Sequence, residues 1–409
     1  MHIRPYEEAR DFEAVKRIWF EIGWIDSEAS AEYLKGFLSL NNCLTGVLDD
    51  AAECLVMTTP GSIRYENDDL RMCAVTAVTT SRVARKQRMA QQLTALQLAA
   101  GAEAGDEVAV LGMFEQGFYD RVGFGTGSYI HTIKFDPASL MVDSGFRPPK
   151  RLTKDDWKDV SAALLARKRG HGGAVLNAPE MLKAELGWSQ KENGFGLGYY
   201  DGSALTHFMW FVTDAVEFGP YSVVLYAYQS SDQLMELLAL LKSLGDQVSM
   251  VEMQEPYDVQ LQTLLRQPFR HRRNSKASVF ANQHNTSAWW QLRILDVAAC
   301  VAKRHWVGQE VSFNLVLEDP VELMLQDSNW QGCGGDYHVN FGTESGAERG
   351  HAEGLPTLNA SVNAFSRLLF GIAPASSLAI TDDLHTEPEL LARLDEALLL
   401  PTMHLGWDF

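Results

Sequence analysis

The sequence of 409 residues predicts a multidomain protein of the α/β and α+β classes, with two mixed-sheet domains followed by a third, α+β domain. Three observations lead to this prediction. The chain is too long for one ordinary hydrophobic core. An order of strand, helix and strand occurs twice before residue 290, and this order is typical of a largely parallel or mixed sheet. After Gln291 the pattern changes to short strands followed by helices.

The first unit is centred on residues 72–80 (MCAVTAVTT), which are apolar on both faces, as in a buried central strand. Apolar residues at helical spacing over 89–100 predict a helix that begins near Arg85. Residues 107–112 (EVAVLG) then return as a strand. We expect a further strand, 129–135, to close this first sheet.

The second unit repeats this order after a linker that contains the prolines of 147–149. A strand is predicted at 222–228 (SVVLYAY), a helix from Ser231, and another strand at 247–253. The turn between this strand and its helix carries no cluster of arginine or glycine residues. The second unit is therefore interpreted as a structural copy that lacks the ligand of the first.

The sequence pattern of the third unit is typical of an α+β domain. Its predicted strands and helices lie at 291–297, 310–319, 321–327, 336–342, 361–370 and 388–399. With the linkers, these patterns predict three domains, at 1–145, 146–288 and 289–409.

The charge of the chain argues against a nucleic-acid partner. The balance is 35 basic against 53 acidic residues, a net charge of −18, which repels nucleic acid unless a basic patch is segregated. The run 270–276 (RHRRNSK) is short and has no interleaved aromatics, so it favours a solvated linker or a phosphate-facing loop. The acidic surplus favours cationic substrates by long-range attraction.

The sequence also bears on location and on metals. No apolar stretch approaches the roughly 20 residues that span a bilayer, and the N-terminal residues have no apolar core of a signal peptide. The five cysteines are scattered without a CxxC pair, which predicts neither a disulfide framework nor a zinc site. We expect a cytoplasmic protein without a metal cofactor.

The turn between strand 72–80 and the next helix is the first candidate site. Arg85, Lys86 and Arg88 lie where a helix N-terminus offers unpaired backbone N–H groups. Together these groups form an anion site suited to a pyrophosphate. A basic first turn exposed to water is the alternative, and the local composition alone does not separate the two.

Two segments resemble a known family. Residues 75–93 (VTAVTTSRVARKQRMAQQL) resemble the acetyl-CoA-binding motif of the GNAT acetyltransferases, Arg/Gln-x-x-Gly-x-Gly/Ala. Residues 114–125 (FEQGFYDRVGFG) resemble one branch, the enhanced intracellular survival (Eis-like) acetyltransferases. The order of units is similar too. The resemblance implies tandem GNAT-like domains, the second degenerate, followed by a sterol-carrier-protein-like domain at 289–409.

The resemblance implies a set of acetyl-CoA contacts. Val78, Thr79 and Thr80 would form the strand edge beside the pantetheine arm, and Phe114 and Glu115 would lie next to the cofactor. The residues that would wrap the pyrophosphate are Arg85, Lys86, Gln87, Arg88, Met89, Ala90 and Gln91. The glycine of the family falls on Arg88. This arginine either supplies a charge-assisted contact or crowds the site.

The resemblance also implies the reacting groups. Tyr119 would donate a proton to the departing thiolate, because a phenol with a pKa of ~10 is protonated at neutral pH. The carboxylate of Phe409 would accept the proton of the amine, and Asp408 would hold a second ammonium group. Trp24 and Tyr33 lie in the helical region that borders substrate in this fold. For Tyr119, Trp24 and Tyr33, ordinary core packing is the alternative reading.

The function implied is an N-acetyltransferase that moves acetyl from acetyl-CoA to primary amines of a cationic acceptor, of aminoglycoside or lysine type. Transfer would occur by direct attack in a ternary complex. The resemblance also implies a homo-oligomer, a trimer or a hexamer of two trimers. The competing hypothesis is a non-catalytic protein, in which Arg88 blocks the cofactor and the C-terminal domain binds a lipid-like or apolar ligand.

Overall fold

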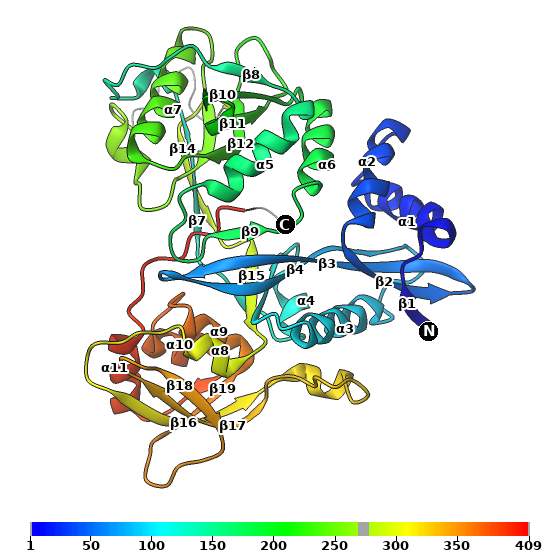
Figure 1. Ribbon diagram of the computed structural model, residues 1–409, viewed down its shortest axis with the longest axis vertical. Coiled ribbons are helices and arrows are strands. Elements are labelled where there is room, and N and C mark those ends of the chain that lie inside the picture. The colour runs from blue at the N-terminus through cyan, green and yellow to red at the C-terminus, as the bar shows by residue number, and fades with distance from the viewer. Residues whose placement is uncertain (1, 269–277, 408–409) are drawn as a thin grey trace.

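The computed structural model of the chain describes residues 2–268 and 278–407, and its strands form three sheets (Figure 1). The basic run 270–276 and the predicted site residues Asp408 and Phe409 lie outside the described residues. Within the described part of the chain, no helix has the length and apolar character needed to cross a bilayer.

The first sheet has eight strands, with β9 paired to β3 beside the main path. In spatial order the main path is β1 (His2–Pro5), β2 (Asn42–Leu48), β3 (Ala51–Tyr65), β4 (Asp68–Thr80), β5 (Val108–Gly112), β15 (Trp290–Ile294) and β6 (Gly125–Thr126), and β9 is Ala174–Leu176. The β4–β5 pair is parallel and the other pairs are antiparallel. The strands predicted at 72–80 and 107–112 are thus confirmed.

Helices cover both faces of this sheet. They are α1 (Glu8–Ile22), α2 (Glu28–Ser39), α3 (Met89–Glu103) and the short α4 (Gln116–Asp120). Side chains alternate along a strand, so Cys54 and Val56 of β3 belong to the core under α3, whereas Leu55 and Met57 belong to the core under α1. Burial on both faces explains why the central parts of these strands are largely apolar.

The second sheet confirms the repeat of the strand–helix–strand unit. In spatial order it contains β14 (Gln283–Ser287), β7 (Ile130–Phe135), β13 (Val251–Gln254), β12 (Tyr221–Ala227), β11 (Ala204–Val212), β10 (Phe195–Asp201) and β8 (Lys150–Leu152). Its helices are α5 (Trp157–Ala166), α6 (Met181–Trp188) and α7 (Ser231–Ser243). The β12–β13 pair is parallel, like β4–β5 in the first sheet.

The first and second sheets exchange strands along the chain. β7, the strand predicted to close the first sheet, pairs instead with β13 and β14 in the second sheet. β15, predicted to belong to the third unit, returns to the first sheet and pairs with β5. A strand pattern in the sequence specifies which faces are buried but leaves the partner strand open. The domain limits at 145 and 288 remain predictions, and strand pairing crosses both.

The third sheet contains β18 (Gly346–Arg349), β17 (Gly335–Phe341), β16 (Val311–Glu318), β19 (Thr357–Ser361) and β20 (Leu384–His385), in that spatial order. It packs with α8 (Val297–Val301), α9 (Val362–Leu369), α10 (Ala375–Thr381) and α11 (Pro388–Ala397). The strand predicted at 321–327 is wrong. Pro320–Met324 is a 3₁₀ helix, because Pro320 removes a backbone donor and the Asp319 side chain accepts from the Val321 N–H at 3.2 Å.

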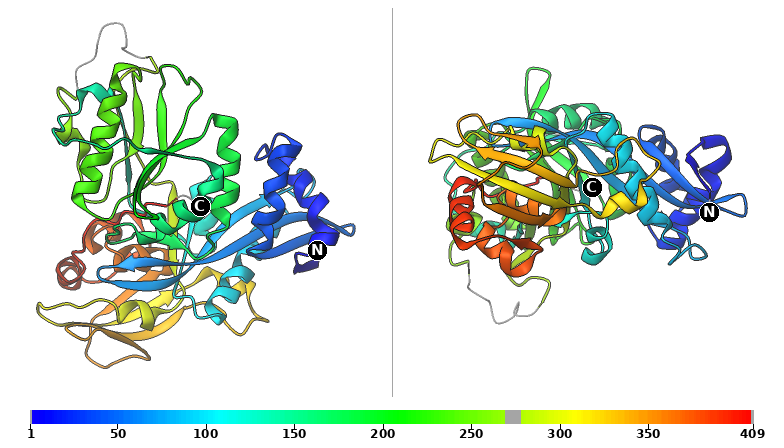
Figure 2. Two further views of the ribbon diagram at one scale, coloured as in Figure 1. Left: turned by 45° about the horizontal axis from the view of Figure 1, so that its top comes forward. Right: turned by 90° about the horizontal axis from the view of Figure 1, so that it is seen from below.

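The described C-terminal end returns to the junction of the first two sheets (Figure 2). The Ser128 hydroxyl donates to the Met403 carbonyl at 2.8 Å, and the Ala174 N–H donates to the Leu405 carbonyl at 3.0 Å. Ala174 is the first residue of β9. The tail therefore runs beside a strand of the first sheet, in contact with both halves of the molecule.

Candidate active site

The parallel strands β4 and β5 separate at one end. Their pairing runs from Met72–Val108 to Val75–Leu111, whereas β4 continues to Thr80. Just beyond the last pair, Ala77 has a φ of 51°, and the register with β3 shifts between Leu55 and Met57. Such a bulge bends a strand and ends its pairing. Among the described strands none pairs with β4 on this side beyond Val75, so residues 78–80 present an open backbone edge.

The turn after β4 carries three exposed cations, Arg85, Lys86 and Arg88. Their side chains have no ion pair or hydrogen bond among the described residues. Lys86 and Arg88 have φ values of 64° and 60°, in the left-handed region. Residues in this region cannot continue a right-handed helix. For this reason α3 begins at Met89, later than the predicted start near Arg85.

Arg88 lies where the motif has glycine, and the structure gives the reason for that glycine. The left-handed region is open to glycine without steric cost. Arg88 adopts the same backbone conformation at φ 60°, with its side chain exposed to solvent. The backbone of the turn therefore follows the path expected for a glycine, although the residue at this position is an arginine.

The side chains of other expected cofactor residues are engaged within the chain. Met89 and Ala90 are buried in the core under α3, and the Gln87 side chain donates back to the Val83 carbonyl at 3.1 Å. The hydroxyls of Thr79 and Ser81 are buried without a hydrogen-bond partner in the described part of the chain. Buried polar atoms normally have a partner, so these two hydroxyls mark a place suited to a ligand or water.

Tyr119 lies on α4, a short helix capped by the Glu115 side chain, which accepts from the Gly117 N–H at 3.1 Å. The Tyr119 ring is 2% exposed and stands edge-on to Phe118, with centroids 4.8 Å apart. Phe114 lies 5.7 Å away and is 72% exposed. Burial raises the pKa of Tyr119 well above its ordinary value, so the phenol stays protonated at neutral pH.

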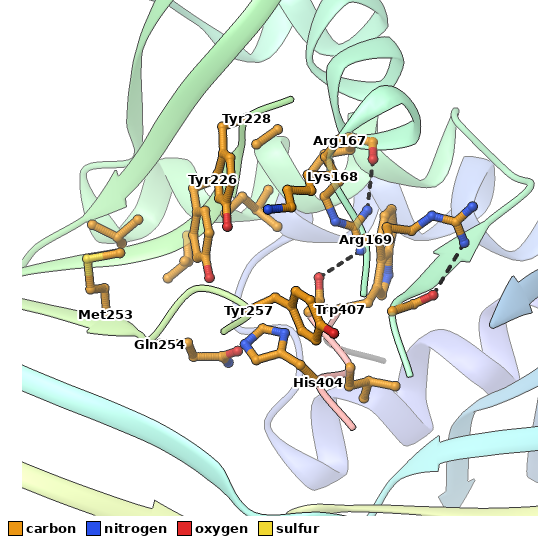
Figure 3. A pocket seen from close by; sticks show the side chains of 18 of the residues that line it. Arg167, Lys168, Arg169, Tyr226, Tyr228, Met253, Gln254, Tyr257, His404 and Trp407 are labelled. Atoms are coloured by element: carbon orange, nitrogen blue, oxygen red, sulfur yellow. Dashed lines mark hydrogen bonds between the residues drawn. The ribbon is translucent and has the colours of Figure 1, made fainter. Parts of the chain in front are cut away.

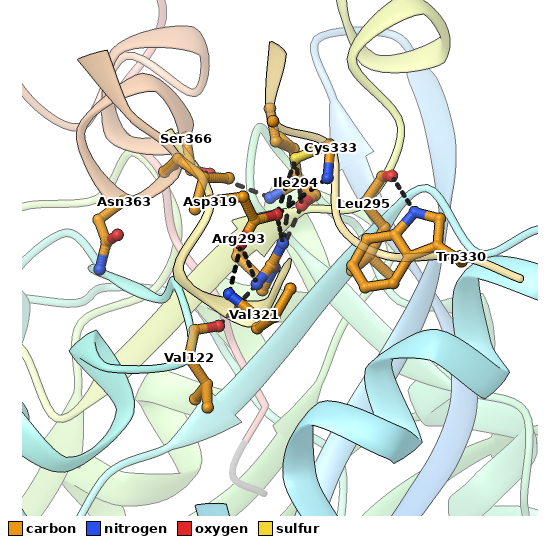
Figure 4. Close-up of polar contacts among 12 residues, drawn as sticks. Val122, Arg293, Ile294, Leu295, Asp319, Val321, Trp330, Cys333, Asn363 and Ser366 are labelled. Carbon is orange, nitrogen blue, oxygen red and sulfur yellow. Dashed lines mark hydrogen bonds and ion pairs between the residues drawn. The ribbon is translucent and has the colours of Figure 1, made fainter. Parts of the chain in front are cut away.

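The turn after Tyr119 is held by residues far along the chain (Figure 4). The Arg293 guanidinium donates to the Val122 carbonyl at 2.6 Å, and it forms a fully buried ion pair with Asp319 at 2.6 Å. The Asn363 amide donates to the carbonyls of Asp120 and Phe124 at 3.0 and 2.7 Å. These contacts fix the end of α4 from β15 and from α9, and Asp319, which follows β16, holds Arg293 in place.

A cavity of about 310 Å³ opens at the β4 bulge. Its walls come from α1, α2, α6, β4 and β9, and it is lined by Trp19, Trp24, Phe37, Thr76, Ala77, Leu176, Met181, Glu185 and Trp188. The Trp19 and Trp24 rings meet edge-to-face at 5.1 Å, and Trp188 lies 5.9 Å from Trp19. Glu185 is the charged residue among them. The cavity is thus an aromatic box with one carboxylate.

The predicted substrate residues separate in the structure. Trp24 lines the cavity and is 48% exposed. Tyr33 lies outside it: its hydroxyl accepts from the Lys154 ammonium at 2.9 Å, and its ring packs against Gly187. Core packing, the alternative for Tyr33, describes its contacts. The tail that leads to Asp408 and Phe409 passes β9, whose last residue, Leu176, lines the cavity.

Sequence reasoning missed several residues around the site. Glu185 and Trp188 reach the cavity from the second unit, and no motif identifies them. Arg293 had a signal, because a basic residue inside the apolar strand 290–294 must have a buried partner. Asn363 had none, since its role depends on carbonyls more than 200 positions earlier in the chain.

Comparisons with known proteins agree with this geometry. Residues 2–127 match the family model described as an acetyltransferase (GNAT) domain. No curated protein matches the chain in sequence. Among solved structures, a probable N-acyltransferase from Enterococcus faecalis V583 has 15% identity and a TM-score of 0.79, covering 100% of this chain and 99% of that chain.

Two further solved structures have the same extent of similarity. Eis1 from Mycobacterium abscessus has 14% identity and a TM-score of 0.77, with 100% of both chains covered. A GCN5-related N-acetyltransferase from Kribbella flavida has 16% identity and a TM-score of 0.75, covering 100% of this chain and 98% of that chain. At these identities the likeness shows the fold of the whole chain.

Proposed function

We propose that this chain, whose residues 2–127 match the acetyltransferase (GNAT) domain model, transfers acetyl from acetyl-CoA to the primary amine of a cationic acceptor. The observation that carries the proposal is the opening between β4 and β5. The basic turn of Arg85–Arg88 follows the open edge of β4, Tyr119 follows β5, and the aromatic cavity meets β4 at Ala77. With these three features around one opening, the thioester carbon of acetyl-CoA would lie at the β4 bulge.

The described residues fit acetyl-CoA as co-substrate. The open edge at Val78–Thr80 offers N–H and C=O groups for the amides of the pantetheine arm. Arg85, Lys86 and Arg88 surround the first N–H groups of α3, where a pyrophosphate binds well. The backbone N–H groups of the turn from Gln87 to Gln91 complete this cradle, with Phe114 and Glu115 beside the thioester end. In this proposal Arg88 supplies charge and does not block the turn.

In this proposal two groups of the chain carry out the proton transfers of the reaction, one as an acid and one as a base. The neutral amine attacks the thioester carbonyl carbon in a ternary complex, a C–N bond forms, and the C–S bond breaks. The Tyr119 phenol gives its proton to the departing thiolate. The carboxylate of Phe409 takes the proton released by the new amide nitrogen, through water. No covalent bond to the enzyme is needed.

The cavity supports a lysine-type acceptor ahead of an aminoglycoside. Tryptophan faces attract an ammonium group, and the Glu185 carboxylate adds a direct partner. An alkylamine needs these features and little more. An aminoglycoside presents several ammonium groups, and each needs its own acidic partner when water is excluded. Asp408 would provide one more carboxylate for an acceptor with two ammonium groups.

The test of this proposal has two stages. Calorimetry of the full chain with acetyl-CoA measures binding first, and absence of binding would reject the enzyme in favour of a non-catalytic protein blocked at Arg88. Release of free thiol is then followed with a lysine-containing peptide and with an aminoglycoside. Turnover that requires Tyr119 supports the acetyltransferase, and the ratio of kcat/KM values for the two amines ranks the acceptors.

Three further parts of the proposal rest on resemblance. They are a sterol-carrier-like character of residues 289–409, a homo-oligomeric assembly and a cytoplasmic location. Light scattering on the purified chain measures the assembly directly. A mass of one chain at micromolar concentration would remove the trimer or hexamer from the proposal.

A further inference from the structure

The second sheet repeats the opening of the first. β12 and β13 pair in parallel from Tyr221–Val251 to Val223–Met253, and β12 then continues to Ala227 without β13 beside it. The pair β4–β5 separates in the same way. Residues 222–228 line a cavity of about 240 Å³ at this opening (Figure 3). The second unit has therefore kept the cleft in which the first unit would hold acetyl-CoA.

The end of this cleft is changed in a way that excludes a pyrophosphate. The turn after β12 leads into α7, whose N-cap is Ser230, with its hydroxyl accepting from the Gln233 N–H at 3.3 Å. The first turn of α7 carries Asp232 and no basic residue. One N–H group at the start of α7 is already bonded to the Ser230 side chain. The negative charge of Asp232 would repel a diphosphate. The ligand of the second cleft differs from that of the first.

Positive charge enters the cleft from the opposite side, on the segment that follows α5. The Lys168 N–H donates to the Tyr228 carbonyl at 2.7 Å, which ties this segment to the end of β12. The Lys168 ammonium has no hydrogen bond or ion pair among the described residues and points toward the space beside Tyr228 (Figure 3). Arg169, its neighbour, is already paired with Asp69 at 3.1 Å.

Arg167 is a second cation of the cleft without an anionic partner. Its guanidinium donates to the carbonyls of Leu164, Ala174 and Gly406, at 2.8, 2.5 and 3.0 Å, and lies 5.2 Å from the centre of the Trp407 ring. Among residues 2–268 and 278–407 it contacts no carboxylate. Burial, and to a smaller degree the charge of Arg169, lowers the pKa of Arg167 to about 10. An anion in the cleft would relieve this cost of desolvation.

Two tyrosines give the cleft a hydroxyl donor and a flat apolar wall. The Tyr226 and Tyr228 rings are parallel within 3° at 6.3 Å. The Tyr226 hydroxyl donates to the Glu255 carbonyl at 3.4 Å, whereas the Tyr228 hydroxyl points toward the space beside Lys168 (Figure 3). Burial raises the pKa of Tyr228 to about 12, so its hydroxyl is a donor at neutral pH. The carboxylate of Glu252 also lines the cleft, and it is paired with Lys134 at 3.6 Å.

We propose that this cleft binds a small organic oxyanion, a carboxylate or a phosphate ester, held by Lys168, the Tyr228 hydroxyl and the field of Arg167. Its planar part packs along the Tyr226 and Tyr228 side chains. Gly406 and Trp407 form one wall of the cleft, so the bound anion also contacts the tail that leads to Phe409. The site is separate from the acetyl-CoA opening, and its occupancy is measured without acetyl-CoA.

The experiment is calorimetry of the full chain with benzoate and with phenyl phosphate at constant ionic strength, with benzamide as the neutral probe. Saturable binding of either anion, but not of benzamide, supports the site. The anion that binds more tightly shows whether the natural ligand is a carboxylate or a phosphate ester. Lys168→Gln is expected to weaken the binding about tenfold, as for a lost charged hydrogen bond. Lys158→Gln, an exposed lysine on α5 outside the cleft, is expected to leave it unchanged.

Two results would overturn the proposal. They are no saturable binding of either anion, and equal binding by the wild type and Lys168→Gln. Neither depends on acetyl transfer, so failure of the site and failure of the acetyltransferase are read separately.

Discussion

Arg293 and Asp319 form an ion pair at 2.6 Å in which both side chains are completely buried. The same guanidinium donates to the carbonyl of Val122, at the turn that follows Tyr119. Burial acts to raise the pKa of Asp319, but the Arg293 charge and the hydrogen bonds outweigh it and leave that pKa lowered. One buried pair thus joins β15, the third sheet and the helix of the proposed catalytic acid.

Asp319→Asn tests this pair as a structural support. The variant leaves the Arg293 charge buried and unpaired, so the free energy of unfolding is expected to fall by about 3–5 kcal/mol. Urea denaturation of the two proteins measures the difference. Asp383→Asn, an exposed neighbour in sequence to β20, is the control and is expected to change stability by less than about 0.5 kcal/mol. Equal stability of Asp319→Asn and wild type would contradict the role of the pair.

Tyr119→Phe tests the proposed acid. The substitution keeps the ring in its aromatic cluster and removes the proton, so kcat is expected to fall by roughly 10²–10⁴ while the Kd of acetyl-CoA stays the same. Tyr129→Phe, at a tyrosine that is 66% exposed, is the matched control. A Tyr119→Phe enzyme with wild-type kcat would remove this residue from the chemistry.

The pH dependence of kcat gives a second reading of Tyr119. Because burial raises the pKa of this phenol, the acid stays protonated beyond its ordinary range. The wild-type rate is expected to rise with pH as the acceptor amine loses its proton, without a decline from Tyr119 up to about pH 10. A descending limb between pH 7 and 9 that disappears in Tyr119→Phe would show that the raised pKa is wrong.

Arg88→Gly separates backbone strain from charge in the cofactor turn. Glycine adopts a φ of 60° freely, so the variant is expected to be more stable by about 1 kcal/mol in thermal unfolding. It also loses one cation, and we expect a severalfold higher Kd for acetyl-CoA. Arg88→Lys keeps the charge and should bind like wild type. Tighter binding by the glycine variant would mean that the arginine crowds the site.

Glu185→Gln tests the acceptor cavity. The variant keeps the shape of the side chain and removes its charge, so KM for a lysine-type amine is expected to rise about tenfold with acetyl-CoA binding unchanged. Glu180→Gln, at an exposed position before α6, is the control. An unchanged KM for the amine would place the acceptor outside this cavity.

A chain extended by one alanine after Phe409 tests the proposed base. The extension moves the terminal carboxylate away, and turnover is expected to fall by roughly 10² or more, as for the loss of a general base. Binding of acetyl-CoA should remain. The same alanine added before Met1 serves as the control. Full activity of the C-terminal extension would assign the proton transfer to another group.

The local patterns of the chain predicted much of the fold and less of its connectivity. The strand at 72–80 was predictable because burial on both faces makes it largely apolar, and the strand at 222–228 because it is rich in valine and tyrosine. The partners of β7 and β15 were not, since pairing is decided by contacts between residues distant in the sequence. A propensity for strand structure is a local property, and the choice of sheet is not.

The candidate site shows the same division. The cofactor turn and Tyr119 lie in continuous motifs, and the structure places them at the two sides of one opening. Trp24 and Tyr33 are close in sequence, yet only Trp24 lines the cavity, because Trp24 lies in the loop after α1 whereas Tyr33 lies on α2 and packs against Gly187. Glu185 enters from another unit and has no local signature.

The exchange of β15 has a consequence for how this protein can be divided. The family match ends at residue 127, yet the neighbour of β5 is supplied by residues 290–294. A polypeptide cut at 127 would expose the edge of β5 and leave Val108–Leu111, a fully apolar run, available for aggregation. The segment that matches the family model is therefore short of one strand of its own sheet. That strand is supplied from the last third of the chain, so a fragment limited to residues 2–127 lacks part of the sheet that it forms here.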